Sequence, residues 1–546
     1  MSLKIKQISS LEKILPRALA GDNEVYKKTL LRGQSFSYQI ALTETSAGLY
    51  EVSVDSPIAD MVTVYEVQNA IMDLPTTAPG YDQDFLTEVP GIMPDILMPI
   101  EMSNNTVKAA FGTNCVWVEI KTDKKIAPGV YPVTINFKNK TQEIDVSTTM
   151  SVEIIDAVLP DQKLLFTQWF HVDCIADIHG VEIYSKKHWE LIEKYMMMAK
   201  KVGINMILTP VITPPLDTAV GTTRPCTQLV KISKDKNGYS FDFTLLDKWI
   251  RLCKKCGIHY YEISHLFSQW GLACSPNIKV TENGEEYYKF GWHVDAKSAE
   301  YKEFLEAFLP ALIDFLKAKK IKERCYFHVS DEPHVDHIEN YAYAHSIITS
   351  LIDGCKTFDA LSNYEFYEKG LIKTPVTCTN CITPFIEHGV EDQWAYYCCG
   401  QIYKVGNRFL GMPSYRNRIL GLQLYKYNIK GFLQWGYNFY YSQYSLKKIN
   451  PYVTTSAERA FPSGDPFSVY PVQNGVVPSL RAIIFKEALE DIQVCEKLEK
   501  IIGRDKVIAM IDDAAGMNVT FENYPRNSEF IPNLMEKMLK IIKEKA

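Results

Sequence analysis

The chain has 546 residues, 46% hydrophobic and 12% aromatic, with a net charge of −6. This length exceeds one ordinary domain, so we expect two or three domains with large apolar cores. The basic residues are spread along the sequence and form no runs, which argues against a nucleic-acid partner. No segment is apolar over the length needed to span a bilayer, so no membrane partner is expected.

The cysteine usage favours a reduced intracellular protein. There are 13 cysteines, an odd number, and Cys325 lies in an apolar segment, which is not typical of a disulfide-linked protein. Two Cys-x-x-Cys pairs, 253/256 and 378/381, are far apart in sequence and are interpreted as buried thiols instead of a zinc site. The first residues contain no apolar stretch of signal-peptide length. We therefore expect a cytoplasmic protein without a metal or other cofactor.

Residues 1–160 are predicted to form an antiparallel β-sandwich. Turn residues separate several segments in which apolar and polar residues alternate: 34–42, 49–54, 116–120, 130–137 and 144–158. Many short strands without helices are typical of this fold. The stretch from Met72 to Pro99 is rich in Pro, Gly and Asp and is predicted to be a long loop.

After Pro160 the sequence alternates between helical and strand patterns. An amphipathic segment ends at Gly203 and a short apolar strand follows it. The predicted strands are 165–171, 204–209, 260–264, 325–330, 358–361, 376–378, 394–397 and 432–435. Eight strand–helix units predict a (β/α)₈ barrel over residues 161–503, followed by a helical extension over 504–546. An open doubly wound sheet is the alternative, but no strand is followed by Gly-x-Gly-x-x-Gly.

Two adjacent carboxylates, Asp331 and Glu332, follow the predicted fourth barrel strand and precede Pro333. The C-terminal ends of barrel strands carry the active site in this fold. Pro333 is expected to keep Glu332 extended, because the α region clashes with the proline ring. Glycoside cleavage needs an acid for the leaving oxygen and a group that stabilises the cationic sugar carbon. The pair therefore predicts a glycoside hydrolase with a carbohydrate substrate.

The residue before the acid suggests which sugar is bound. Barrel glycosidases often have Asn there, whose amide can donate to a sugar 2-hydroxyl. Asp331 can only accept when ionised, which suits the N–H of a 2-acetamido group. The last two predicted strands do not end in a nucleophilic carboxylate. We therefore expect the acetamido oxygen to attack the anomeric carbon and form an oxazoline, with Asp331 holding the N–H and Glu332 acting as acid and then base.

Aromatic and polar residues near other strand ends are expected to form the binding pocket. Rings stack on sugar C–H faces, and a tyrosine hydroxyl can bind the acetamido oxygen. The expected substrate-binding residues are Trp435, Tyr437, Trp394, Tyr396, Asp173, His265 and Trp270. His328, His334 and Asp336 lack a third ligand at suitable spacing, so they do not predict a metal site.

The sequence resembles glycoside hydrolase family 123, the N-acetyl-β-galactosaminidases, from about Gln168 to Asp491. The matching segments are 331–333, 433–437, 464–471, 479–481 and 487–491. The resemblance implies a retaining, substrate-assisted mechanism on β-linked N-acetylgalactosamine, with Asp331 stabilising the acetamido group and Glu332 as acid/base. It makes Trp435, Tyr437 and Asp465 pocket candidates. Arg481 is predicted to begin a helix. Its alternative to a role in the pocket is a structural ion pair. Residues 482–485 are less charged than the family pattern, which leaves the sugar specificity open.

Two other interpretations remain open. An ordinary retaining β-glycosidase would use Glu332 as the acid and a nucleophile such as Glu365, Glu387 or Asp465. A non-catalytic carbohydrate-binding protein would use the same cleft without turnover. A thiazoline mimic of the oxazoline should inhibit only the substrate-assisted enzyme, and turnover of 2-acetamido glycosides separates an enzyme from a binding protein.

Overall fold

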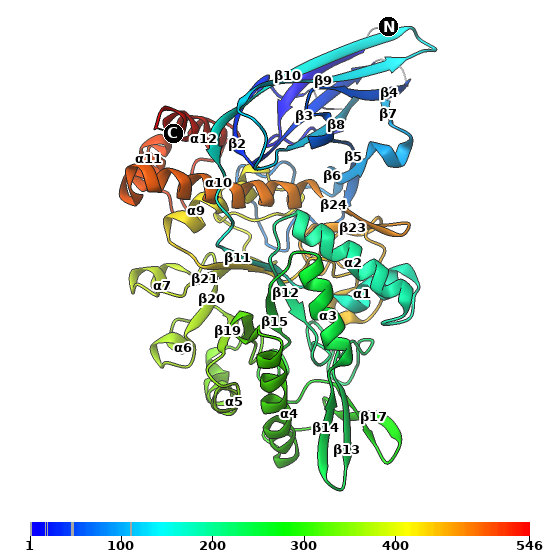
Figure 1. Ribbon diagram of the computed structural model, residues 1–546, viewed down its shortest axis with the longest axis vertical. Helices are drawn as coiled ribbons and strands as arrows, with labels where there is room; N and C mark the ends of the chain where they lie inside the picture. The colour runs from blue at the N-terminus through cyan, green and yellow to red at the C-terminus, as the bar shows by residue number, and fades with distance from the viewer. Residues whose placement is uncertain (1–2, 17, 19, 45–47, 110–111, 546) are drawn as a thin grey trace.

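The computed structural model describes residues 3–545 except 17, 19, 45–47 and 110–111. Two N-terminal sheets are followed by a parallel barrel and then by C-terminal helices (Figure 1). No helix in the described part of the chain is both long and apolar enough to cross a membrane.

The N-terminal part is a β-sandwich of two five-stranded sheets, as predicted. One sheet has the order β1 (Lys4–Ser9), β3 (Ser35–Glu44), β8 (Gly112–Lys121), β5 (Val62–Met72) and β6 (Gly91–Pro99), all antiparallel. The other has the order β2 (Lys27–Arg32), β10 (Ile144–Val158), β9 (Gly129–Asn139), β4 (Gly48–Asp55) and β7 (Thr106–Ala109), in which β2 and β10 run parallel. Inward side chains at alternate positions, such as Val133, Ile135 and Phe137 on β9, fill the core.

The stretch from Met72 to Pro99 is only partly a loop, contrary to the prediction. Its last nine residues form β6, which pairs with β5. Pro94 lies in this strand where the register of the pair shifts. A strand tolerates proline at such an irregularity, so the proline did not mark a loop.

The second part is a nearly closed barrel of eight parallel strands, and all eight predicted strands are present. They are β11 (Leu165–Gln168), β12 (Met206–Thr209), β15 (Tyr260–Ile263), β18 (Cys325–Phe327), β19 (Lys356–Leu361), β20 (Thr374–Cys378), β21 (Trp394–Tyr396) and β22 (Gly431–Gln434). Consecutive strands pair from β12 to β22, and β22 pairs with β11. Asn205 bridges the remaining gap, because its side chain and backbone both hydrogen-bond to Phe166.

Helices of unequal length surround the barrel. In α3, Leu246, Trp249, Ile250 and Cys253 are buried at helical spacing, so one apolar stripe faces the strands. The helices α6 and α7 are single turns. The helices are α1 (Val172–His179), α2 (Lys186–Lys201), α3 (Thr244–Lys255), α4 (Ala299–Ala318), α5 (Ile338–Leu351), α6 (Glu365–Glu368), α7 (Thr383–Glu387), α8 (Tyr415–Arg418), α9 (Leu420–Lys426) and α10 (Leu480–Ile502).

An additional four-stranded sheet extends away from the barrel on the side opposite the sandwich (Figure 1). It consists of the hairpin β13 (Lys231–Asp235) with β14 (Gly238–Asp242) and the hairpin β16 (Ile278–Glu282) with β17 (Glu285–Phe290). The second hairpin lies between Cys274 and Gly291, where the sequence predicted no strand. Asn283 and Gly284 both have positive φ at its turn, and Asn-Gly is the preferred pair for such a hairpin.

The helix α10 lies between the sandwich and the barrel (Figure 1). Its Arg481 forms a buried ion pair with Asp95 of β6, with 2.8 Å between Nε and Oδ1. Its Lys486 pairs with Glu119 of β8 at 3.0 Å, also buried. Arg481 is thus the structural ion-pair residue that the sequence allowed. Two further helices, α11 (Arg504–Ala515) and α12 (Phe530–Lys545), contact α10.

Candidate active site

The two acids follow β18, the fourth barrel strand, and backbone hydrogen bonds hold them on both sides. The amide of Glu332 donates to the carbonyl of Ala360 on β19 at 3.1 Å. The carbonyl of Asp331 accepts from the amide of Trp270, in the loop after β15, at 3.2 Å. Neighbouring strand ends therefore fix the position of the pair.

Glu332 is not extended, contrary to the prediction from Pro333. Its φ is +43°, in the left-handed region. For a residue with a side chain such a conformation costs about 1–3 kcal/mol and persists only where surrounding contacts impose it. The bonds from Glu332 to Ala360 and Tyr396 are contacts of this kind. Backbone strain of this kind is common at active sites.

Both acids line a pocket at the C-terminal end of the barrel, which encloses about 650 Å³ including the space at its open mouth. Tyr396, Trp435 and Trp270 line the same pocket, so five of the predicted site residues come together there. The remaining lining residues are Trp169, His171, Leu216, Asp217, Gln269, Ala360, Cys398, Cys399, Leu433 and Phe461.

The acids differ in their hydrogen bonding and share a raised pKa. The hydroxyl of Tyr396 donates to Oε1 of Glu332 at 2.8 Å, whereas no described residue hydrogen-bonds to the carboxylate of Asp331. Desolvation within the pocket raises the pKa of Glu332 although the residue is exposed at the pocket surface, and the Tyr396 bond opposes this shift. Burial and then the charge of Glu332 raise the pKa of Asp331 well above its usual range. Two close acids with raised pKa values can hold one proton between them, which suits general acid catalysis.

A buried charge cluster lies behind the acids. His328 contacts Glu262 at 2.7 Å through Nε2 and Asp359 at 3.0 Å through Nδ1, and these two carboxylates hold its pKa at about 9 despite burial. The indole of Trp169, in the pocket wall, also donates to Glu262. Asp359 accepts from the amide of Val329 at 3.0 Å, which fixes the segment leading to the acids.

His265 belongs to this cluster and does not line the pocket. Its ring stacks on His328, with 3.9 Å between ring centroids. In the described part of the chain His265, His328 and Asp359 have the spacing of metal ligands. However, both nitrogens of His328 already contact carboxylates, so the cluster fits a protonated imidazole better than a metal ion.

Trp435 is oriented by Asp465, which also lies outside the pocket lining. The indole Nε1 donates to Oδ2 of Asp465 at 2.8 Å, and Gln434 donates to Oδ1 at 3.1 Å. Asp465 is fully buried, and burial raises its pKa to about 6. Both of its oxygens therefore hold side chains beneath the pocket.

The other predicted binding residues lie in the packing around the pocket. Tyr437 stacks on Phe170 and donates to the carbonyl of Tyr195. Trp394 is inside the barrel against Phe358. It points to the same side of β21 as Tyr396 but lies one layer deeper, because barrel interiors are filled in layers.

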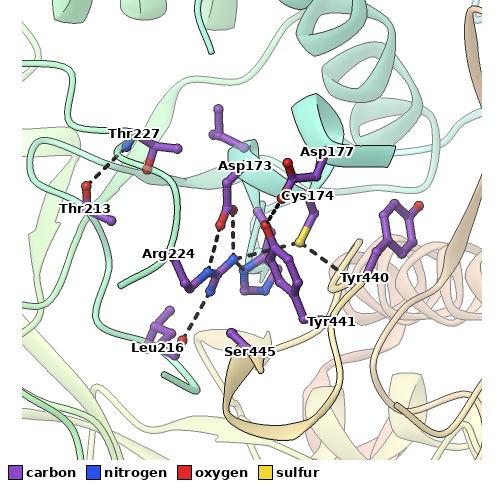
Figure 2. A network of polar contacts seen from close by, with 12 residues as sticks. Asp173, Cys174, Asp177, Thr213, Leu216, Arg224, Thr227, Tyr440, Tyr441 and Ser445 are labelled. Atoms are coloured by element: carbon purple, nitrogen blue, oxygen red, sulfur yellow. Dashed lines mark hydrogen bonds and ion pairs between the residues drawn. The ribbon is translucent and has the colours of Figure 1, made fainter. Parts of the chain in front are cut away.

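Asp173 forms a buried ion pair with Arg224, with 2.7 Å between Oδ1 and Nη2, and Figure 2 shows this pair within a wider polar network. Arg224 also donates to Nδ1 of His171 at 3.2 Å. A guanidinium can only donate, so Nε2 of His171 carries the proton and donates to the carbonyl of Trp435 at 3.0 Å. Asp173 therefore acts on the pocket through Arg224 and His171.

Asp217 is a third pocket carboxylate that the sequence reasoning missed. It lies in the loop after β12, and Oδ2 accepts from the amide of Tyr444 at 2.9 Å. The three alternative nucleophiles considered from the sequence do not line the pocket: Asp465 lies beneath it, and Glu365 and Glu387 belong to α6 and α7. Asp217, Gln269, Cys398 and Phe461 lie in irregular segments, where no periodic pattern marks a side chain that faces a site.

This chain is similar to known proteins of one glycoside hydrolase family. The model of the glycoside hydrolase 123 catalytic domain matches residues 169–498. No curated protein matches the sequence. A family 123 glycoside hydrolase from Clostridium perfringens is similar with a TM-score of 0.75 and 15% identity, over 100% of this chain and 99% of that chain.

Two further structures are much less similar. A β-glucuronidase from Parabacteroides merdae has a TM-score of 0.31 and 11% identity, over 89% of this chain and 52% of that chain. A family 5 mannosidase from Rhizomucor miehei has a TM-score of 0.35 and 10% identity, over 68% and 97%. Since the family model covers more than half of the sequence and includes the pocket acids, the chain belongs to glycoside hydrolase family 123 and is a glycosidase with a carbohydrate substrate.

Proposed function

We propose that this glycosidase hydrolyses β-linked 2-acetamido sugars, N-acetylgalactosaminides above all, with retention and through an oxazoline intermediate. The observation that carries the proposal is the adjacent pair of pocket acids with different partners. Glu332 is held by Tyr396, and Asp331 has both oxygens open to a ligand with respect to the described residues.

In the first step the acetamido oxygen attacks the anomeric carbon and forms the new C–O bond of the oxazoline. The bond from that carbon to the leaving oxygen breaks, and Glu332 gives this oxygen its proton. The amide nitrogen becomes more positive as the ring forms, and the carboxylate of Asp331 accepts its hydrogen bond and offsets the charge.

In the second step water attacks the anomeric carbon from the face that the leaving group vacated. Glu332 takes a proton from this water, and the oxazoline C–O bond opens to restore the acetamido group. The two inversions give net retention, and the two acids return to their starting protonation.

A second candidate uses a carboxylate nucleophile, because Asp217 shares the pocket with the pair. Glu332 would again act as the acid, and Asp217 would form a glycosyl-enzyme ester. This mechanism needs no acetamido group, so the substituent at C2 of the sugar separates the two.

The test is a panel of aryl β-glycosides that differ at C2 (acetamido or hydroxyl) and at C4 (galacto or gluco). We expect turnover of the 2-acetamido galactoside with retention, inhibition by its thiazoline analogue, and a decrease in kcat of about 10²–10⁴-fold in Glu332→Gln. Glu365→Gln is the matched control, because Glu365 lies on α6 outside the pocket. Equal turnover of the 2-hydroxy glycoside and covalent labelling of Asp217 would support the second candidate instead.

A further inference from the structure

The mouth of the pocket carries two half-exposed aromatic rings. Trp270 is 47% exposed and Tyr444 is 39% exposed. Their rings meet edge to face, with 5.8 Å between centroids. The pocket interior is different, because Trp169 and Tyr396 are each only 4% exposed. Exposing large apolar rings to water is unfavourable. Such rings beside a pocket offer faces on which a ligand can stack.

Asp217 joins the segments that carry these rings. Its Oδ2 accepts from the amide of Tyr444 at 2.9 Å, and its carbonyl accepts from the hydroxyl of Ser445 at 2.6 Å. Its own amide donates to the side chain of Gln269, the residue before Trp270, at 2.5 Å. No described residue is bonded to Oδ1 of Asp217, so this oxygen can accept from a ligand.

Contacts within the chain impose the arrangement of this rim. Asp217, Trp270, Tyr444 and Ser445 have φ values of +40°, +55°, +58° and +54°, a conformation that surrounding contacts must impose. Behind this rim Arg224 donates to the carbonyl of Leu216 at 3.1 Å and anchors the loop (Figure 2). A preorganised rim loses less conformational entropy on binding than a mobile one.

We infer that Trp270, Tyr444 and Asp217 form a subsite for the sugar ring of the leaving group. The inference rests on the proposed function, in which Glu332 protonates the leaving oxygen and the rest of the substrate extends toward the mouth. Aromatic faces bind the C–H side of a pyranose, and a free carboxylate oxygen accepts from its hydroxyl groups. The substrate is accordingly a disaccharide unit or a longer glycan.

A lipid surface is the competing occupant. Val220 and Leu446 lie in the same loops and are 80% and 67% exposed, as expected of residues that insert into a membrane interface. The carboxylate of Asp217 favours the sugar, because a charged group loses hydration when it enters an apolar phase.

The test compares two substrates that share the inner sugar. One is N-acetylgalactosamine β-linked to galactose, and the other is its methyl β-glycoside, which has no second ring. Tyr444→Asn and Trp270→Asn remove the rings but keep a residue that tolerates positive φ. We expect the ratio of kcat/KM values, disaccharide over methyl glycoside, to fall by about 5- to 10-fold in each variant. Tyr287→Asn, at an exposed tyrosine on β17, is the control.

The outcomes separate this inference from the proposed function. The inhibition constant of the thiazoline, which occupies only the inner sugar site, tests the proposed function in the wild type. Strong thiazoline inhibition with an unchanged substrate ratio in both variants would overturn the subsite while the proposed function stands. An unchanged ratio combined with lower activity on a glycolipid in vesicles would also overturn it, in favour of a lipid contact. No inhibition and no turnover in the wild type would overturn the proposed function itself.

Discussion

Replacing Tyr396 with Phe should move the alkaline limb of the pH–activity profile upward. The Tyr396 hydroxyl donates a 2.8 Å bond to Glu332, and this bond opposes the increase in the Glu332 pKa that desolvation causes. A hydrogen bond to a charged group is worth about 1.5–3 kcal/mol, and 1.36 kcal/mol corresponds to one pKa unit. Loss of the bond should therefore raise the limb by about one to two pH units.

The limb is expected to move to higher pH because Glu332 acts as the acid. Glu332 must be protonated in the first step, so activity is lost as pH rises through its pKa, and a higher pKa extends activity to higher pH. The assay is kcat/KM against pH, which reports the free enzyme. The substrate is the disaccharide, because a poor leaving group depends on the acid.

Tyr397→Phe is the matched control for this experiment. Tyr397 is the next residue, is equally buried, and donates to Asn417 outside the pocket. The alkaline limb of the pH–activity profile of Tyr397→Phe should coincide with that of the wild type. A Tyr396→Phe limb that is unchanged or shifted to lower pH would refute the assignment of Glu332 as the acid controlled by Tyr396.

Three further predictions concern the surroundings of the pair. Asp331→Asn should lower kcat by about 10²–10³-fold, because a neutral amide offsets less of the positive charge on the oxazoline; steady-state kinetics with folding checked by circular dichroism measures this. Asp465→Ala should raise KM by a larger factor than it lowers kcat, since Trp435 loses its partner. A decrease in kcat as large as the increase in KM would contradict this role. His328→Gln should flatten the stability profile between pH 7 and 9 in urea unfolding. The folded-state pKa of His328 is about 9 and the ordinary value is near 6.5, so its contribution is complete below pH 6.5 and about 3 kcal/mol is lost as pH rises through 9.

The barrel was predictable because its strands are short apolar runs that alternate with amphipathic helices. Residues 204–209 illustrate this, since a buried strand follows a helix that ends at a glycine. The additional sheet was missed because β16 and β17 are mostly polar and resemble a loop. Its turn was nevertheless marked by Asn283 and Gly284, a hairpin signal in the sequence.

The site was only partly predictable. Asp331 and Glu332 follow a recognisable strand, so their position was clear, but the left-handed φ of Glu332 depends on contacts from other strands. Tyr396 and Trp394 are two residues apart on β21 and point to the same side of the strand, and the alternation of the sequence does not tell the layer of one from that of the other. Tyr437 was misplaced because β22 ends at Gln434, and alternation holds only within a strand. Asp217 depends on loop geometry that sequence periodicity does not describe.

The position of α10 limits how the gene could be divided or recombined. A fragment that began after Pro160 would lack Asp95 and Glu119 and would leave the cations of Arg481 and Lys486 without their counter-charges. In the intact chain, replacing Asp95 or Glu119 alone would leave a buried cation unpaired at a cost of about 3–5 kcal/mol, a large share of the net stability of a typical domain, about 5–15 kcal/mol. Fusion of this catalytic half to a foreign module would therefore present to the new partner two cations of α10 that carboxylates of β6 and β8 neutralise in the intact chain.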